Sequence, residues 1–143
     1  MSEGTRPLSL LVAALGGEGG GVLASWVVAL AARQGWPTQS TSIPGVAQRT
    51  GATTYYMEIL PLEAVRRGEQ QPGPVMALTP FPGHVDVMLA SELIEVGRAL
   101  ENGYVTPDRT TLIGSTHRIY AMQEKTSMAD GRYPGDRVLR AAR

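Results

Sequence analysis

The stretch LSLLVAALGGEGGGVLASWVVALAAR, residues 8–33, decides the fold. Its first seven residues form a short run that is apolar except for Ser9, which is typical of a strand buried on both faces. The turn GGEGGG follows at residues 16–21. Val22 to Arg33 is long and rich in Ala, Val and Leu, and it predicts a helix that ends at Gly35. A buried strand, a glycine turn and a helix are the opening of an α/β unit.

Further strands and helices extend this unit along the chain. Thr38 to Ile43 and Thr53 to Leu60 are predicted strands, and the roughly nine residues between them are too few for a parallel crossover. We therefore expect the second of them to run antiparallel. The other expected elements are strands at Val85 to Ala90, Thr110 to Ser115 and Arg118 to Met122, and helices capped by Ser91 and at Asp136 to Arg143. The predicted class is α/β, a three-layer Rossmann-like open sheet, mostly parallel with at least one antiparallel strand.

Composition limits the classes of function. The 143 residues include 13 basic and 13 acidic side chains, so the formal net charge is zero, which removes the electrostatic argument for nucleic-acid or membrane-surface binding. The chain has no cysteine, which excludes a disulfide and an iron–sulfur cluster ligated by this chain. Only two histidines remain as imidazole ligands, so no metal site is expected. The length fits one domain spanning residues 1–143.

No segment of the sequence predicts a membrane span. The longest near-apolar stretch, Gly21 to Ala32, is shorter than the roughly 20 residues that a bilayer needs. Leu8 to Leu15 is similar to the apolar part of a secretory signal, but it is short, and Glu3 precedes it. We therefore expect a cytoplasmic protein. A separate expectation concerns the Pro-rich loop from Glu63 to Gly83, whose apolar part at Val75 to Phe81 is predicted to contribute to a subunit interface.

The glycine turn fits a dinucleotide site poorly. In the spacing G-x-G-x-x-G counted from Gly17 the last place is Val22, and counted from Gly19 it is Ala24, which only the relaxed form allows. The acidic residue that binds a ribose is missing, because no Asp or Glu lies between Gly19 and Met57. The alternative is that the glycines serve a tight turn and close packing of helix on sheet.

Arg49 is the first candidate for function. It lies between two predicted strands with no acidic residue nearby in sequence, and a guanidinium there suits a carboxylate, a phosphate or an acid of a partner chain. Pairing with a distant acid is the structural alternative. Ser40 and His117 lie near strand ends, where α/β sheets place ligands, although such residues also satisfy loop backbone. The full candidate set for ligand or partner binding, with no catalytic residue among it, is Gly16, Gly17, Gly19, Gly45, Gln48, Arg49, Gly51, Ser40 and His117.

Three motifs give the sequence a resemblance to a known family. ALGGEGGGV at residues 14–22 is similar to a G-x-G-G-Q-G-V-type turn, and PGVAQRTG at residues 44–51 to a G-x-A-Q-R-G-G-type motif. The run STHRIYAMQEKTSMADGRY at residues 115–133 is also similar. The chain thus resembles the gamma-type domain of the 2-oxoacid:ferredoxin (acceptor) oxidoreductases, especially the small (beta) subunit of the indolepyruvate type. Ala14 and Glu18 depart from the motif, and an anionic Glu18 disfavours phosphate at this turn.

The resemblance implies a division of labour between subunits. These enzymes decarboxylate a 2-oxoacid oxidatively to an acyl-CoA with thiamine diphosphate, and iron–sulfur clusters pass the electrons to ferredoxin. The chain has neither cysteine nor a thiamine diphosphate motif, so both cofactors are expected on a large (alpha) partner subunit, with coenzyme A as co-substrate. The chain alone is then inert. Because it stops at Arg143 inside a predicted helix, the domain is expected to be truncated at its C-terminus relative to the family.

Other interpretations of the sequence stay open. One is a stand-alone nucleotide- or CoA-binding α/β module. Another is a non-catalytic assembly subunit whose Gln48–Arg49 loop serves docking alone. A homo-oligomer is compatible with each of them.

Overall fold

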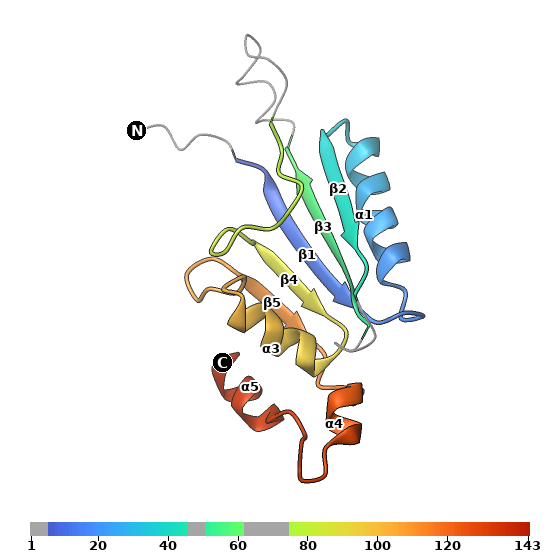
Figure 1. Ribbon diagram of the computed structural model, residues 1–143. Helices are drawn as coiled ribbons and strands as arrows, with labels where there is room; N and C mark the ends of the chain where they lie inside the picture. The colour runs from blue at the N-terminus through green and yellow to red at the C-terminus, as the bar shows by residue number, and fades with distance from the viewer. Residues whose placement is uncertain (1–5, 46–50, 62–74) are drawn as a thin grey trace.

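The computed structural model describes residues 6–45, 51–61 and 75–143. Helices and strands alternate along most of the chain (Figure 1). In order they are β1 (Leu8–Ala14), α1 (Gly20–Arg33), β2 (Thr38–Ile43), β3 (Thr53–Ile59), β4 (Val87–Ala90), α3 (Leu93–Glu101), β5 (Thr111–Gly114), α4 (Met122–Thr126) and α5 (Gly135–Ala141). In the described ranges, no helix combines the length and the apolar character needed to cross a bilayer.

The five strands form one mixed sheet in the order β2-β3-β1-β4-β5. Strand β1 pairs in parallel with β4, and β4 in parallel with β5. Strand β3 runs antiparallel to both of its neighbours, β1 and β2. The predicted antiparallel strand is therefore confirmed, because the short connection after β2 leaves no room for a crossover helix.

Two layers of helix enclose the sheet, as expected. Side chains of β1 alternate between its faces. Val12 packs in a cluster with Ala24 of α1, whereas Leu11 packs in a second cluster with Leu93 and Val96 of α3. Helix α1 therefore covers one face and α3 the other, as Figure 1 shows. The three-layer α/β class is confirmed.

The helix α1 begins two residues earlier than expected, at Gly20. A Cβ atom on Gly20 would lie 2.5 Å from the Cβ of Ala14 and 3.0 Å from the ring of Tyr55. Only glycine allows the first turn of the helix to approach the sheet this closely. Close packing of helix on sheet is thus one physical role of the glycine string.

Two local predictions are wrong. Residues 118–121 form no strand, and helix α4 begins at Met122. There the carboxylate of Glu124 accepts a hydrogen bond from the backbone N–H of Ala121 at 2.8 Å, so a side chain, rather than a strand ladder, satisfies this backbone. Helix α3 is capped by Glu92 and not by Ser91, because the Glu92 carboxylate accepts from the N–H of Ile94 at 2.6 Å.

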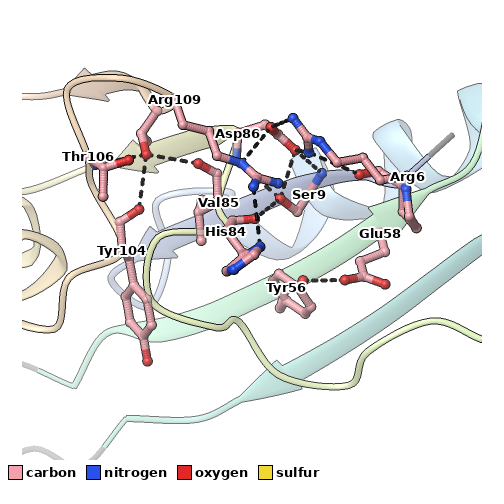
Figure 2. Close-up of polar contacts among 12 residues, drawn as sticks. Arg6, Ser9, Tyr56, Glu58, His84, Val85, Asp86, Tyr104, Thr106 and Arg109 are labelled. Carbon is pink, nitrogen blue, oxygen red and sulfur yellow. Dashed lines mark hydrogen bonds and ion pairs between the residues drawn. The ribbon is translucent and has the colours of Figure 1, made fainter. Parts of the chain in front are cut away.

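A buried carboxylate, Asp86, fastens the amino ends of the parallel strands (Figure 2). The guanidinium of Arg6 donates to both of its oxygens, at 2.8 and 2.7 Å. The backbone N–H of Ser9 donates at 2.9 Å, and Nε of Arg109 at 3.2 Å. Burial opposes ionisation, but the hydrogen bonds from Arg6 and Ser9 outweigh it and hold the pKa of Asp86 well below its ordinary value. This Asp86 cluster joins the starts of β1 and β4 to the turn before β5.

Candidate functional site at the carboxyl edge of the sheet

The predicted motifs lie at the opposite edge of the sheet, where the carboxyl ends of the parallel strands are found. Strands β1, β2, β4 and β5 run in the same direction, so the glycine turn, Gly45, Ser91 and His117 all follow strand ends at this edge (Figure 1). Helix α1 leaves β1 on one face of the sheet, and α3 leaves β4 on the other. Open α/β sheets bind ligands at such a point, outside the carboxyl ends of the strands. This edge is therefore the candidate site.

The glycine turn contains an acidic residue, Glu18, whose carboxylate forms hydrogen bonds within the site. Gly17 and Gly19 have φ angles of 85° and 81°, in the left-handed region that favours glycine. Between them, the Glu18 carboxylate accepts hydrogen bonds from the N–H of Leu15 at 3.2 Å and from the Ser91 hydroxyl. Glu18 thus links the turn after β1 to the turn after β4. An anionic ligand at this turn would meet a like charge, so a phosphate does not fit here.

The loop that carries the Q-R motif begins and ends at the same edge. Gln48 and Arg49 lie outside the described residues. Before the loop, Gly45 packs tightly, since a Cβ atom there would lie 1.9 Å from the carbonyl oxygen of Ala52. After the loop, Gly51 has a φ of 74°. The two ends of the loop therefore lie close together in the structure.

A cavity of about 320 Å³ opens beside the ends of this loop, on the face of the sheet that α3 covers. Its volume is in the range of small-molecule pockets. Its floor is apolar and buried, and most of its polar side chains come from α3 and the residues that follow it, with Thr54 of β3 in addition. The lining consists of Leu11, Ala13, Ile43, Pro44, Gly45, Ala52, Thr54, Met88, Glu95, Arg98, Ala99, Asn102 and Tyr104.

An ion pair stands on the wall of this cavity. The guanidinium of Arg98 lies 2.6 Å from the carboxylate of Glu95, one turn earlier on α3. The Glu95 side chain is only 6% exposed, and the Arg98 side chain is 30% exposed. The pair is not among the candidate residues that the sequence singles out. The i,i+3 spacing of opposite charges is the signal that could have identified the pair.

A second acid, at the N-cap of α3, is also buried. Glu92 is fully buried, and its carboxylate accepts from the N–H of Ile119 at 3.0 Å as well as from Ile94. Arg118 Nε lies 3.6 Å from it. Glu92 thus fixes the segment that follows β5 against the start of α3. Burial of the Glu92 carboxylate requires these hydrogen-bond donors and the nearby cation.

The remaining two candidates, His117 and Ser40, lie in different places in the structure. His117 lies at the carboxyl edge, where its side chain is exposed and its carbonyl accepts from the N–H of Leu93 at 2.9 Å. Ser40 lies inside β2 rather than at its end. It lines a groove on the α1 face together with Ser25, Ser42 and Tyr55. Among the described residues, no group of three or more His, Asp and Glu could hold a metal ion.

Together these features define a Rossmann-like domain with its candidate site at the carboxyl edge of the sheet, the position at which open α/β sheets bind ligands. The model of the pyruvate ferredoxin/flavodoxin oxidoreductase family matches residues 9–141, and the chain therefore belongs to that family. The family-level resemblance predicted from the motifs is thereby confirmed.

Comparison with individual proteins adds one structural likeness. The chain is similar to the gamma subunit of a keto/oxoacid ferredoxin oxidoreductase from Geobacter sulfurreducens PCA, with 16% sequence identity and a TM-score of 0.42. The similarity covers 74% of this chain, and this chain spans 60% of the length of that subunit. The sequence has no match among curated proteins.

Proposed function

We propose that this chain is the small subunit of a 2-oxoacid:ferredoxin oxidoreductase of the indolepyruvate (arylpyruvate) type. The family match over residues 9–141 carries the proposal. The chain works with a large (alpha) subunit, on which a 2-oxoacid is decarboxylated oxidatively to an acyl-CoA and the electrons pass to ferredoxin. The indolepyruvate type rests on the motifs at residues 44–51 and 115–133.

Thiamine diphosphate and the iron–sulfur clusters belong to the large subunit in this proposal. The chain has no cysteine to ligate a cluster, and the carboxylate of Glu18 occupies the turn where a diphosphate would otherwise be held. Among residues 6–45, 51–61 and 75–143, none therefore fits either cofactor. When bound on the partner, thiamine diphosphate supplies the carbanion chemistry of the decarboxylation.

The contribution of this chain is binding and positioning. The loop with Gln48 and Arg49 begins and ends at the cavity of about 320 Å³, which has an apolar floor and polar groups on one wall. Arg49 supplies a planar guanidinium suited to the carboxylate of the 2-oxoacid, to a phosphate of coenzyme A or to an acid of the large subunit. We place the binding role at this loop and not at the glycine turn.

Co-purification tests the proposed partnership. An affinity-tagged copy of the chain, expressed in its own host, is expected to retain a brown, cluster-bearing large subunit through a salt wash. A tag alone on an unrelated carrier protein of similar size is the control. Recovery of a colourless chain that binds coenzyme A in equilibrium dialysis without any partner would instead support the stand-alone module, which the cavity favours as the second candidate function.

A further inference from the structure

A second cavity lies in the C-terminal part of the chain, between helix α5 and the segment that connects β5 to it (Figure 1). Its volume is about 580 Å³, in the range of small-molecule sites. Leu93 at the start of α3 contributes to the lining, and the other lining residues lie between 118 and 140, so the whole lining falls within the described range 75–143. We call it the arginine cavity, because its lining includes Arg118, Arg132, Arg137 and Arg140.

One wall of the arginine cavity is the segment 118–133, and its own contacts fix it in place. The carboxylate of Glu124 accepts from the N–H of Tyr133 at 2.6 Å and also pairs with the guanidinium of Arg118. On this wall the ring of Tyr120 lies 5.3 Å from the guanidinium carbon of Arg118, a cation–π contact. Because Glu92 pairs with Arg118 as well, the charge of this arginine is balanced within the protein.

Helix α5 forms the other wall of the arginine cavity. Its buried residue Val138 packs in one cluster with Leu93 and Val96 of α3, which fixes the helix against the domain. Residues three apart on a helix lie on the same face. Arg137 and Arg140 have this spacing, and both are exposed and line the cavity. Helix α5 therefore presents two guanidiniums, one turn apart, to the cavity.

The two arginines of α5 differ from the others in their charge balance. Arg132 donates to both carboxylate oxygens of Asp130, at 2.8 and 2.9 Å, and is therefore neutralised. Among the residues that the structure describes, Arg137 and Arg140 form neither an ion pair nor a side-chain hydrogen bond. The lining places one further acid beside them, Asp136. Two cations thus face the cavity against a single carboxylate, which leaves a positive charge for a ligand to balance.

We propose that the arginine cavity binds a small molecule that carries a phosphate or diphosphate group. A phosphate group bears up to two negative charges near neutral pH and offers three acceptor oxygens, which matches two guanidiniums better than a single carboxylate does. Each guanidinium donates two parallel hydrogen bonds to such a group, and Arg137 and Arg140 are one turn apart, so both can serve one ligand. The proposal concerns the residues around α5 and does not rest on the proposed enzymatic function.

Titration calorimetry of the full chain with pyrophosphate, at low ionic strength, tests the proposal. Saturable binding is expected, and Arg137→Ala and Arg140→Ala should each raise the dissociation constant about tenfold, the lower end for loss of a charge-assisted contact, because both side chains are exposed. Asp136→Asn removes a like charge and should lower the dissociation constant. Arg33→Ala, in the exposed last turn of α1, is the matched control and should change nothing.

Further measurements separate this cavity from other sources of anion binding. Circular dichroism is expected to show that the exposed arginine variants keep the parent fold. ADP in place of pyrophosphate distinguishes a nucleotide, which should bind more tightly, from a free diphosphate, and either order of affinity is compatible with the site. A parent chain that binds neither at millimolar concentration would overturn the proposal. So would binding that the double substitution of Arg137 and Arg140 leaves unchanged, or that Arg33→Ala or Arg49→Ala weakens as much, since the anion would then lie elsewhere.

Discussion

Substitution of Asp86 by alanine is expected to lower the free energy of unfolding by about 3 kcal/mol, the lower end for breaking a buried ion pair. The Arg109 side chain is only 19% exposed, so its cation loses a partner where water cannot fully replace it. Arg6 is 54% exposed, and water solvates it more readily, which keeps the loss at the lower end. The N–H of Ser9 also loses its acceptor. Urea unfolding followed by circular dichroism measures the change.

A second substitution of Asp86 tests the role of its charge, and a substitution of an exposed aspartate serves as the control. Asp86→Asn keeps the shape and one acceptor, so it is expected to be less destabilising than alanine. Asp130 forms an exposed pair with Arg132, in which both side chains are 65% exposed, and Asp130→Ala is expected to leave the urea midpoint unchanged. Equal destabilisation by the Asp86 and Asp130 substitutions would contradict the structural role of the Asp86 cluster.

The same carboxylate gives the fold a dependence on acid. The pKa of Asp86 is lower in the folded than in the unfolded chain, so its contribution to stability is complete above the ordinary Asp pKa. That contribution is lost as the pH falls from about 4 toward the folded pKa. The difference in unfolding free energy between the parent and Asp86→Asn should therefore shrink below that pH. A constant difference down to strong acid would contradict this assignment.

The second large effect is expected at Arg49. If Arg49 binds coenzyme A or the 2-oxoacid, Arg49→Ala should assemble normally and raise the Michaelis constant for that ligand alone. Loss of a charge-assisted contact costs roughly 1.5–3 kcal/mol, about ten- to a hundredfold. Arg49→Lys keeps the charge but loses the planar fork, so its effect should be smaller. Steady-state kinetics of the assembled enzyme, with each substrate varied in turn, measures both variants.

Assembly separates the two roles of Arg49. If the guanidinium only docks the large subunit, the alanine variant should fail to co-purify, and any complex that forms should keep its normal constants. Arg33, which is exposed in the last turn of α1, offers a matched control substitution by alanine that should change neither property. An Arg49→Ala enzyme that assembles and turns over like the parent would remove Arg49 from the functional residues.

Local patterns predicted the architecture well because the signals lie within single segments. The apolar run before the glycines, the helix after them and the short connection between β2 and β3 each depend on neighbouring residues. The contacts of Glu92 and Glu18 could not be predicted because their partners are distant in sequence. Glu92 accepts from Ile119, 27 residues away, and Glu18 contacts Ser91, 73 residues away. The i,i+3 spacing of Glu95 and Arg98 predicts an ion pair, but the same spacing occurs on exposed helices, so only the tertiary fold shows that Glu95 is buried.

The cavity could not be predicted from the sequence for the same reason. Its floor comes from β1 and β4, its wall from α3, and its rim from the ends of the Q-R loop. No spacing rule connects Ala13, Met88 and Asn102, which meet only when the strand order β3-β1-β4 is known. The sequence nevertheless predicted one part of this site, because the motif at residues 44–51 identified the loop that begins at Gly45 as a candidate binding segment.

We propose above that this chain acts as one subunit of a two-subunit oxidoreductase. The most direct test is acyl-CoA formation from indolepyruvate, coenzyme A, thiamine diphosphate and ferredoxin by the chain alone, by the purified large subunit alone and by the two combined. No product is expected from the isolated chain, and turnover is expected from the combination. Turnover by the isolated chain, or a large subunit whose rate does not change when the chain is added, would contradict it.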